Sequence, residues 1–208
     1  MLLVVGGQSR KIGKTAVAAG LIAAVPEAGW TAVKITQHVH PAELPANART
    51  LERTGDFLMF EQAAPDETDT GRFLSAGARR AFWLQGTAGR LGLLLPALER
   101  ILAHAGNTLI ESNSILEFVA PDLCLMVLDP LLGDFKESCR RFLDRADAFI
   151  LVAPPETRLS GIEAMLAGKP LFRATPPNYV PEEAMTLVRS KLAARGKTTL
   201  NDKMPGDV

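Results

Sequence analysis

The chain has 208 residues, of which 47% are hydrophobic and 22% are charged, a composition typical of a globular protein with a substantial core. Basic and acidic residues number 23 each, so no global field favours nucleic acid or an anionic membrane as a partner. No apolar run approaches the roughly 20 residues of a membrane span, and no signal-peptide pattern is present. We therefore expect a cytoplasmic protein with one domain over residues 1–195 and a flexible polar tail over residues 196–208.

Short, mostly non-alternating apolar runs predict strands, and helix-length segments lie between several of them. Near-continuous hydrophobic strands that alternate with helices are typical of a parallel sheet covered on both faces. The predicted fold class is therefore α/β, a three-layer, mainly parallel sheet with helices on both faces. The predicted strands are 2–5, 31–36, 81–84, 107–111, 123–128, 148–152 and 170–173, and the predicted helices are 14–25, 89–105, 134–146, 158–167 and 181–195.

The segment 37–67 departs from this rhythm, because it is rich in Pro, His, Glu and Thr. It reads as a long excursion after the second strand, with a short helix around residues 46–54 and a short strand near residues 57–60. Long excursions in compact domains are often functional. Elsewhere, Cys124 and Cys139 have no partner at metal-ligand spacing, so we expect both to be buried and inert.

The stretch GGQSRKIGKT joins the first predicted strand to the first predicted helix. A phosphate-binding loop is normally spelled G-x-x-x-x-G-K-[ST], but Gln8 stands five residues before Gly13, and Gly7 lies one residue too early. Two alternatives stay open at this point. Gly7 starts a slightly larger loop, or Gln8 itself takes the position of the first glycine.

A phosphate cradle needs a buried strand, inward-facing backbone amides and the positive end of a helix, and all three are predicted here. In such a loop Lys14 reaches the β- and γ-phosphates and assists phosphoryl transfer, while the Thr15 hydroxyl binds Mg²⁺. Arg10 and Lys11 add cationic donors, and Gly13 allows close approach of the phosphates. The predicted nucleotide contacts in the loop are Gly7, Gln8, Ser9, Arg10, Lys11, Ile12, Gly13, Lys14 and Thr15.

Four further residues carry chemistry. Glu111 ends a predicted buried strand, where a carboxylate can hold Mg²⁺ or orient water, although a surface glutamate is the alternative. Lys34 lies inside an apolar strand, so its side chain is expected to point to the ligand end or to reach solvent. His38 and His40 alternate along an extended chain, which is compatible with a metal site or with two surface histidines.

Four segments together resemble the molybdopterin-guanine dinucleotide biosynthesis protein B family, small P-loop NTPases related to dethiobiotin-synthetase-like and metallochaperone NTPases. The resemblance covers residues 1 to about 130 and implies a P-loop NTPase fold. It also implies that Lys14 and Thr15 bind phosphate and Mg²⁺, that Asp69 and Arg72 lie near the site, and that Glu111 closes it. Asp69 as a helix cap is the alternative. The four segments are GGQSRKIGKT, TAVKITQHVH, DTGRFLSAGARRAFWL and NTLIESNS.

The resemblance implies Mg²⁺-dependent hydrolysis of GTP or ATP by an accessory protein of molybdenum cofactor biosynthesis. Its partners would be the nucleotide and a protein of that pathway, and a homodimer is compatible with it. Two alternatives stay open: an ATP-dependent small-molecule kinase or ligase, and a nucleotide sensor without turnover. The sequence lacks an Asn-Lys-x-Asp guanine motif, so the choice between GTP and ATP also stays open.

Overall fold

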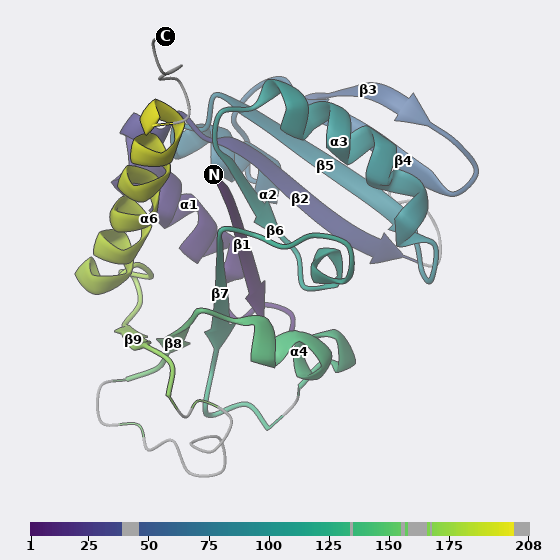
Figure 1. Ribbon diagram of the computed structural model, residues 1–208. Coiled ribbons are helices and arrows are strands. Elements are labelled where there is room, and N and C mark those ends of the chain that lie inside the picture. The colour runs from purple at the N-terminus through teal and green to yellow at the C-terminus, as the bar shows by residue number, and fades with distance from the viewer. Residues whose placement is uncertain (39–45, 134, 155–156, 158–165, 167, 202–208) are drawn as a thin grey trace, which may run out of the picture.

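The computed structural model describes residues 1–38, 46–133, 135–154, 157, 166 and 168–201. Within these residues, nine strands form one sheet in the order β3-β4-β5-β2-β6-β1-β7-β8-β9 (Figure 1). All neighbours from β5 to β9 pair in parallel, and β4 is antiparallel to both β3 and β5. The strands are β1 Leu2–Gly7, β2 Thr31–His38, β3 Ala48–Arg53, β4 Phe57–Gln62, β5 Arg80–Thr87, β6 Thr108–Glu111, β7 Leu123–Leu128, β8 Ala148–Val152 and β9 Leu171–Ala174.

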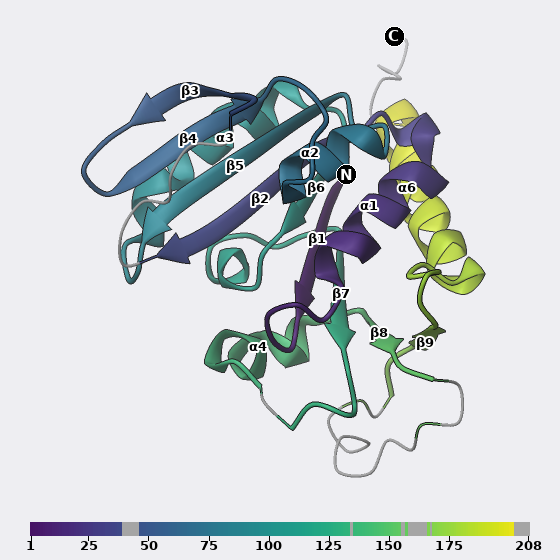
Figure 2. The same ribbon diagram turned by 180° about the vertical axis from the view of Figure 1, so that it is seen from behind.

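Helices cover both faces of the sheet, as the sequence predicts. Helices α1 (Lys14–Ala24), α2 (Asp69–Ser75) and α6 (Glu182–Asn201) pack on one face, where their apolar side chains form one core cluster. Helices α3 (Leu95–His104) and α4 (Glu137–Phe142) pack on the other face around a second cluster. Figures 1 and 2 show the two helical layers from opposite sides. Short 3₁₀ turns occupy Pro26–Ala28, Leu91–Leu94, Ser114–Glu117 and Leu143–Arg145.

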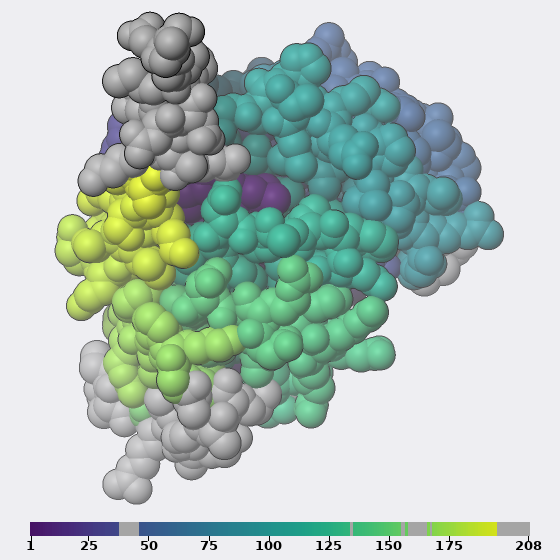
Figure 3. Space-filling model, in the orientation of Figure 1, coloured from purple at the N-terminus to yellow at the C-terminus, as the bar shows by residue number. Residues whose placement is uncertain are grey.

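The central strands β1 and β7 are buried on both faces. Val4 packs into the cluster under α3 and α4, whereas Leu3 and Val5 pack into the cluster under α1 and α6. This two-sided burial explains why these strands read as unbroken apolar runs rather than as alternating patterns. In the space-filling view, the N-terminal segment is visible only as a small purple area between teal, green and yellow segments (Figure 3).

The helix predicted around residues 46–54 is wrong, because this segment forms strand β3. Strand β3 pairs antiparallel with β4, and the predicted strand at residues 57–60 is confirmed as part of β4. Glu61 on β4 accepts hydrogen bonds from Arg49 at 2.8 Å and from Arg80 on β5 at 2.7 Å. These cross-strand ion pairs favour a strand over the local helical preference, and such pairs are invisible in a local pattern.

Other predicted boundaries shift for local reasons. The helix predicted over residues 89–105 starts as a 3₁₀ turn, and α3 itself begins at Leu95 with Pro96 in its first turn. The helix predicted over 158–167 lies almost entirely outside the described residues. Helix α6 continues past Arg195 to Asn201, into the segment predicted as a tail. Among the helices of the described ranges, none combines the length and apolarity that crossing a membrane requires.

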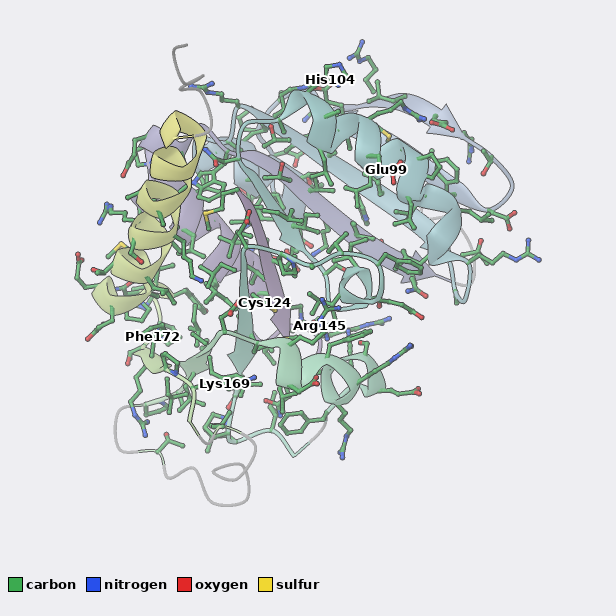
Figure 4. All side chains as sticks on the ribbon, viewed as in Figure 1. Glu99, His104, Cys124, Arg145, Lys169 and Phe172 are labelled. Atoms are coloured by element: carbon green, nitrogen blue, oxygen red, sulfur yellow. The ribbon has the colours of Figure 1, made fainter. Side chains whose placement is uncertain are left out.

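Both cysteines are buried and unpaired, as predicted. Cys124 lies on β7 inside the molecule, whereas Glu99 and His104 on α3 project into solvent (Figure 4). Burial raises the pKa of the Cys124 thiol to about 12 and that of the Cys139 thiol to about 11. Neither thiol therefore has the thiolate character of a reactive cysteine.

Candidate functional site

The loop between β1 and α1 begins where the sequence predicts it. Strand β1 ends at Gly7, and α1 begins at Lys14 with Gly13 as its N-cap. Gly13 has φ +95°, a left-handed conformation that suits glycine, and its carbonyl accepts the first helical hydrogen bond from Val17 at 2.8 Å. The N-terminal amides of α1 therefore face the end of the loop, as phosphate binding requires.

The structure decides between the two alternatives for the start of the loop. A Cβ added at Gly7 would lie 2.8 Å from Cδ1 of Ile12 and 2.9 Å from the Lys14 stem, so a larger residue here would force those two side chains to shift. Gln8 instead anchors the loop from behind, with only 1% of the residue exposed. Its side-chain carbonyl accepts a hydrogen bond from the Asp129 amide at 2.9 Å, and its NH₂ group donates to the Leu132 carbonyl. The loop is therefore one residue larger than usual and starts at Gly7.

Asn113 fixes the end of β1 to the segment after β6, a role that the sequence reasoning missed. Its Oδ1 accepts from the Gly7 amide at 2.6 Å, and its Nδ2 donates to the Gly7 carbonyl at 2.8 Å. Asn113 is buried, so this two-way amide pair holds the entrance of the loop rigidly. The only signal in the sequence was a polar SNS run directly after the strand that ends in Glu111.

Four predicted residues meet in front of the loop. The Thr15 hydroxyl donates to Oε2 of Glu111 at 2.9 Å. The Lys34 ammonium lies 2.8 Å from Oε1 of Glu111 and 2.5 Å from Oδ2 of Asp69. Only 4% of the Glu111 side chain and 12% of the Lys34 side chain are exposed, so this ion pair is largely shielded from water, whereas 40% of the Asp69 side chain is exposed.

The topology explains the meeting of these side chains. Strands β2 and β6 pair in parallel with Lys34 opposite Glu111, and β6 also pairs with β1, which leads into the loop. The carboxyl ends of these strands therefore open into one crevice. Asp69 comes from the first turn of α2, but Thr68 is the N-cap, because its hydroxyl accepts from the Gly71 amide at 3.1 Å. The alternative that Asp69 caps the helix is therefore wrong.

Charge coupling sets the protonation of this cluster. Burial alone lowers the pKa of Lys34, but the Glu111 and Asp69 carboxylates outweigh it, so the net pKa is raised. Burial likewise opposes ionisation of Asp69, yet Lys34 and the Thr15 hydroxyl hold its pKa below the ordinary value. Lys34 is therefore a cation and Asp69 an anion at neutral pH.

The pKa of Lys14 shifts in the opposite direction to that of Lys34. The Lys14 ammonium donates to the Ser9 carbonyl across the loop. Burial, opposed by the Glu111 carboxylate and reinforced by the nearby Lys136 and Lys34, lowers its pKa to about 8. A bound polyphosphate would reverse this shift, because its negative charge stabilises the ammonium. The geometry therefore suits a lysine that binds an anion.

A cavity of about 730 Å³ opens in front of the loop and the cluster. Ligand sites of proteins commonly have this order of volume. Gly7, Gln8, Ser9 and Ile12 do not line this cavity, and they shape the loop from behind instead. The predicted site residues that line it are Arg10, Lys11, Gly13, Lys14, Thr15, Lys34, Asp69, Arg72 and Glu111, and their roles in binding stay predictions.

The oxygen donors of the site fit a magnesium ion. Mg²⁺ prefers one or two carboxylates plus hydroxyl, water and phosphate oxygens, and Thr15, Glu111 and Asp69 supply that donor chemistry around one cation, the Lys34 ammonium. His40 and the side chain of His38 lie outside the described residues. In the described part of the chain, no group of three or more His, Cys, Asp and Glu side chains is arranged as a metal site on its own.

Comparison with solved structures supports the fold alone. No protein-family model matches the chain, and no curated protein matches it significantly. Among solved structures, HypB from Helicobacter pylori in complex with nickel has a TM-score of 0.51 and 13% identity, over 99% of this chain and 91% of that one. A MobB homologue from Bacillus stearothermophilus has a TM-score of 0.42 and 14% identity, over 92% and 98% of the two chains.

A third structure, LpxK from Aquifex aeolicus in complex with ATP, has a TM-score of 0.45 and 17% identity over 83% of this chain and 53% of that one. Together with the strand order and the loop at the end of β1, the similarity to HypB defines the class: the chain has the P-loop NTPase fold. The predicted fold class is therefore confirmed.

Proposed function

We propose that this chain binds a nucleoside triphosphate with Mg²⁺ and hydrolyses it by phosphoryl transfer to water, and that residues 1–195 form the nucleotide-binding domain. One observation carries the proposal. The Thr15 hydroxyl at the start of α1 and the buried Glu111 carboxylate lie 2.9 Å apart beside Lys14, at the mouth of a glycine-bounded loop. This arrangement joins a phosphate cradle to oxygen ligands for a divalent cation.

Each residue has a definite part in this proposal. The loop amides and the Lys14 ammonium bind the β- and γ-phosphates, and Arg10 and Lys11 add positive charge along the chain of phosphates. Thr15, Glu111 and Asp69 would hold Mg²⁺, which neutralises developing charge on the phosphate oxygens when bound. Glu111 can also orient an attacking water, because its carboxylate faces the crevice at the end of β6.

The position of Tyr179 indicates how the nucleotide would be oriented in the cavity. The Tyr179 ring packs on Gly13, since a Cβ added there would lie 2.8 Å from the Tyr179 Cε1 atom. Tyr179 follows β9 and lines the cavity, whereas Glu111 and Lys34 lie at the ends of β6 and β2. We place the base beside the Tyr179 ring and the γ-phosphate beside Glu111, since aromatic faces stack readily on bases. Neither adenine nor guanine is favoured by the described residues.

Nucleotide-dependent thermal stabilisation tests the proposal. We expect Mg-ATP or Mg-GTP to raise the melting temperature of the wild-type protein, because ligand binding to the native state stabilises it. The melting temperature of Lys14→Ala should not change when the nucleotide is added. Lys191→Ala, an exposed lysine on α6, is the matched control and should respond like the wild type. Equal stabilisation of all three proteins, or of none, would overturn the proposal.

Phosphate release then separates hydrolysis from the two alternatives. Release without any added acceptor, lost in Glu111→Gln, supports hydrolysis. Release only after a metabolite is supplied supports a kinase or ligase. Tight binding with no release over hours supports a nucleotide sensor.

The finer assignment to molybdenum cofactor biosynthesis stays a prediction. It rests on the sequence resemblance of residues 1 to about 130, and so do the partner protein and the homodimer. Hydrolysis of GTP or ATP by this chain would not by itself establish that pathway, because one fold supports many activities.

A further inference from the structure

The cavity carries more positive charge than a nucleotide needs. Among the described residues that line it, six side chains are cationic and two are acidic, which leaves an excess of four positive charges. A magnesium nucleoside triphosphate brings about two net negative charges, since Mg²⁺ neutralises part of the phosphate charge. The cationic residues are Arg10, Lys11, Lys14, Lys34, Arg72 and Lys136, and the acidic ones are Asp69 and Glu111.

Lys136 and Arg72 are the two cations of the cavity that belong neither to the phosphate loop nor to the Lys34 ion pairs, and Arg72 helps to lower the pKa of Asp69. Lys14, Arg10 and Lys11 belong to the phosphate loop, and Lys34 is already paired with two carboxylates. Lys136 precedes α4 on the other side of the crevice, and its backbone amide donates to the Gln8 carbonyl at 2.9 Å. Its ammonium forms no ion pair or hydrogen bond with the described residues, although the side chain is partly buried. A partly buried cation with no partner among the described residues gains from binding an anion.

The electrostatic surroundings of Lys136 point the same way. Burial is the largest cause that lowers the pKa of Lys136, and the neighbouring Arg10 and Lys34 cations lower it further. The charges of Arg10 and Lys34 repel the Lys136 ammonium, and a bound anion next to Lys136 would relieve this repulsion. Because Lys34 binds Glu111, this anion would lie at the γ-phosphate end of the nucleotide, away from Tyr179.

The space next to Lys136 continues beyond the nucleotide cavity. Gln37, Ser114 and Ser138 line both the main cavity and a second cavity of about 310 Å³. Ser138 accepts a weak hydrogen bond from Asn113 at 3.4 Å, which links this region to the loop entrance. Hydroxyl and carboxamide groups here can bind the polar body of a small molecule whose anionic group faces Lys136.

We propose that the site takes a second ligand beside the nucleotide, a small molecule whose carboxylate or phosphate group binds Lys136 next to the γ-phosphate. The ligand extends along Ser114, Ser138 and Gln37 into the adjoining cavity. This inference rests on the proposed nucleotide function, because the nucleotide accounts for the other cations.

Calorimetric titration of small anions tests the proposal. The full chain is first loaded with Mg²⁺ and a non-hydrolysable nucleotide triphosphate analogue, so that the γ-phosphate position is filled. Succinate and inorganic phosphate are then titrated separately, and their difference distinguishes a carboxylate ligand from a phosphate ligand. We expect at least one of them to bind at one site, and Lys136→Gln to weaken it about tenfold, as the loss of a charged hydrogen bond does.

The controls separate this proposal from the one on which it rests. Lys191→Gln should bind the anion like the wild type, and the nucleotide affinity of Lys136→Gln, measured without small anions, should stay unchanged. If the nucleotide binds but neither anion does, the second-ligand site is overturned. If Lys136→Gln weakens nucleotide and anion equally, Lys136 belongs to the nucleotide site and the proposal is also overturned. If an anion binds through Lys136 while no nucleotide binds, the nucleotide function fails and the anion site stands.

Discussion

The ammonium of Lys34 lies 2.8 Å from Oε1 of Glu111, a carboxylate of which only 4% is exposed. The same ammonium lies 2.5 Å from Oδ2 of Asp69, so one lysine forms ion pairs with both carboxylates that we assign to Mg²⁺. Two carboxylates this close to a shared centre would repel each other without a cation. Lys34 therefore holds the site together in the absence of metal.

Replacing Lys34 by methionine tests this role, because methionine keeps much of the apolar stem and removes the charge. We expect the free energy of unfolding to fall by about 3 kcal/mol, as when one partner of a buried ion pair is removed. Mg²⁺ should then raise the melting temperature of Lys34→Met more than that of the wild type, since the metal replaces the lost charge. Thermal unfolding in EDTA and in Mg²⁺ measures both effects. An identical Mg²⁺ response in Lys34→Met, Lys191→Met and the wild type would contradict the assignment.

Gln8 offers a direct test of the enlarged loop. Gln8→Gly restores the usual phosphate-loop spelling but removes the side chain that binds the Asp129 amide and the Leu132 carbonyl. We expect the free energy of unfolding to fall by about 2 kcal/mol, because buried backbone groups lose their partners and glycine adds chain entropy. Nucleotide affinity should fall as well, despite the regular spelling. Chemical denaturation and nucleotide titration measure the two effects, and a variant that is stable and binds more tightly would refute the anchoring role.

The sequence predicted those parts of the structure whose cause is local or periodic. The apolar runs of β1 and β7 reflect burial on both faces, and the order of strand and helix placed Glu111 at the crevice. Strand β3 was missed because its stabilising pairs, such as Arg49 with Glu61, are contacts across a hairpin.

The missed site residues have the same explanation. Asn113 acts on Gly7, 106 positions away, and Lys136 reaches the crevice from a turn whose sequence carries no motif. Spacing along the chain does not encode such contacts, which exist only after the sheet has assembled. The contact of Tyr179 with Gly13 is also long-range, since it joins the last loop of the sheet to the first.

Two glycines with almost the same φ angle, Gly13 before α1 and Gly77 after α2, separate the effect of backbone strain from that of a side-chain contact. Gly13 has φ +95° and the Tyr179 ring against it, whereas Gly77 has φ +100° and open space around it. Gly77→Ala should therefore cost only the backbone strain, about 1–3 kcal/mol, and leave nucleotide affinity unchanged. Gly13→Ala should cost more and abolish nucleotide binding, because the added methyl group collides with Tyr179. Equal losses of stability in both variants would show that the contact is unimportant.

The raised pKa values of the two buried thiols predict low reactivity in the folded protein. Burial raises the pKa of Cys124 to about 12 and of Cys139 to about 11, so at pH 8 almost no thiolate is present in the folded protein. A thiol reagent such as iodoacetamide should therefore leave both cysteines unmodified at pH 8 and label both after unfolding in urea. Mass spectrometry of the intact protein measures the number of labels. Rapid labelling of Cys139 in the native protein would show that its side chain is accessible.

Tyr179 tests the direction of the nucleotide, with inorganic triphosphate as a ligand that has phosphates but no base. If the ring stacks on the base, Tyr179→Ala should weaken nucleotide binding by about 1–3 kcal/mol and Tyr179→Phe should keep it, because stacking needs the ring and not the hydroxyl. Inorganic triphosphate should bind the wild type and both variants equally, since it contacts the loop alone. Calorimetric titration of each ligand in the presence of Mg²⁺ gives the affinities. A loss of triphosphate binding in Tyr179→Ala as large as the loss of nucleotide binding would instead assign Tyr179 to the support of Gly13.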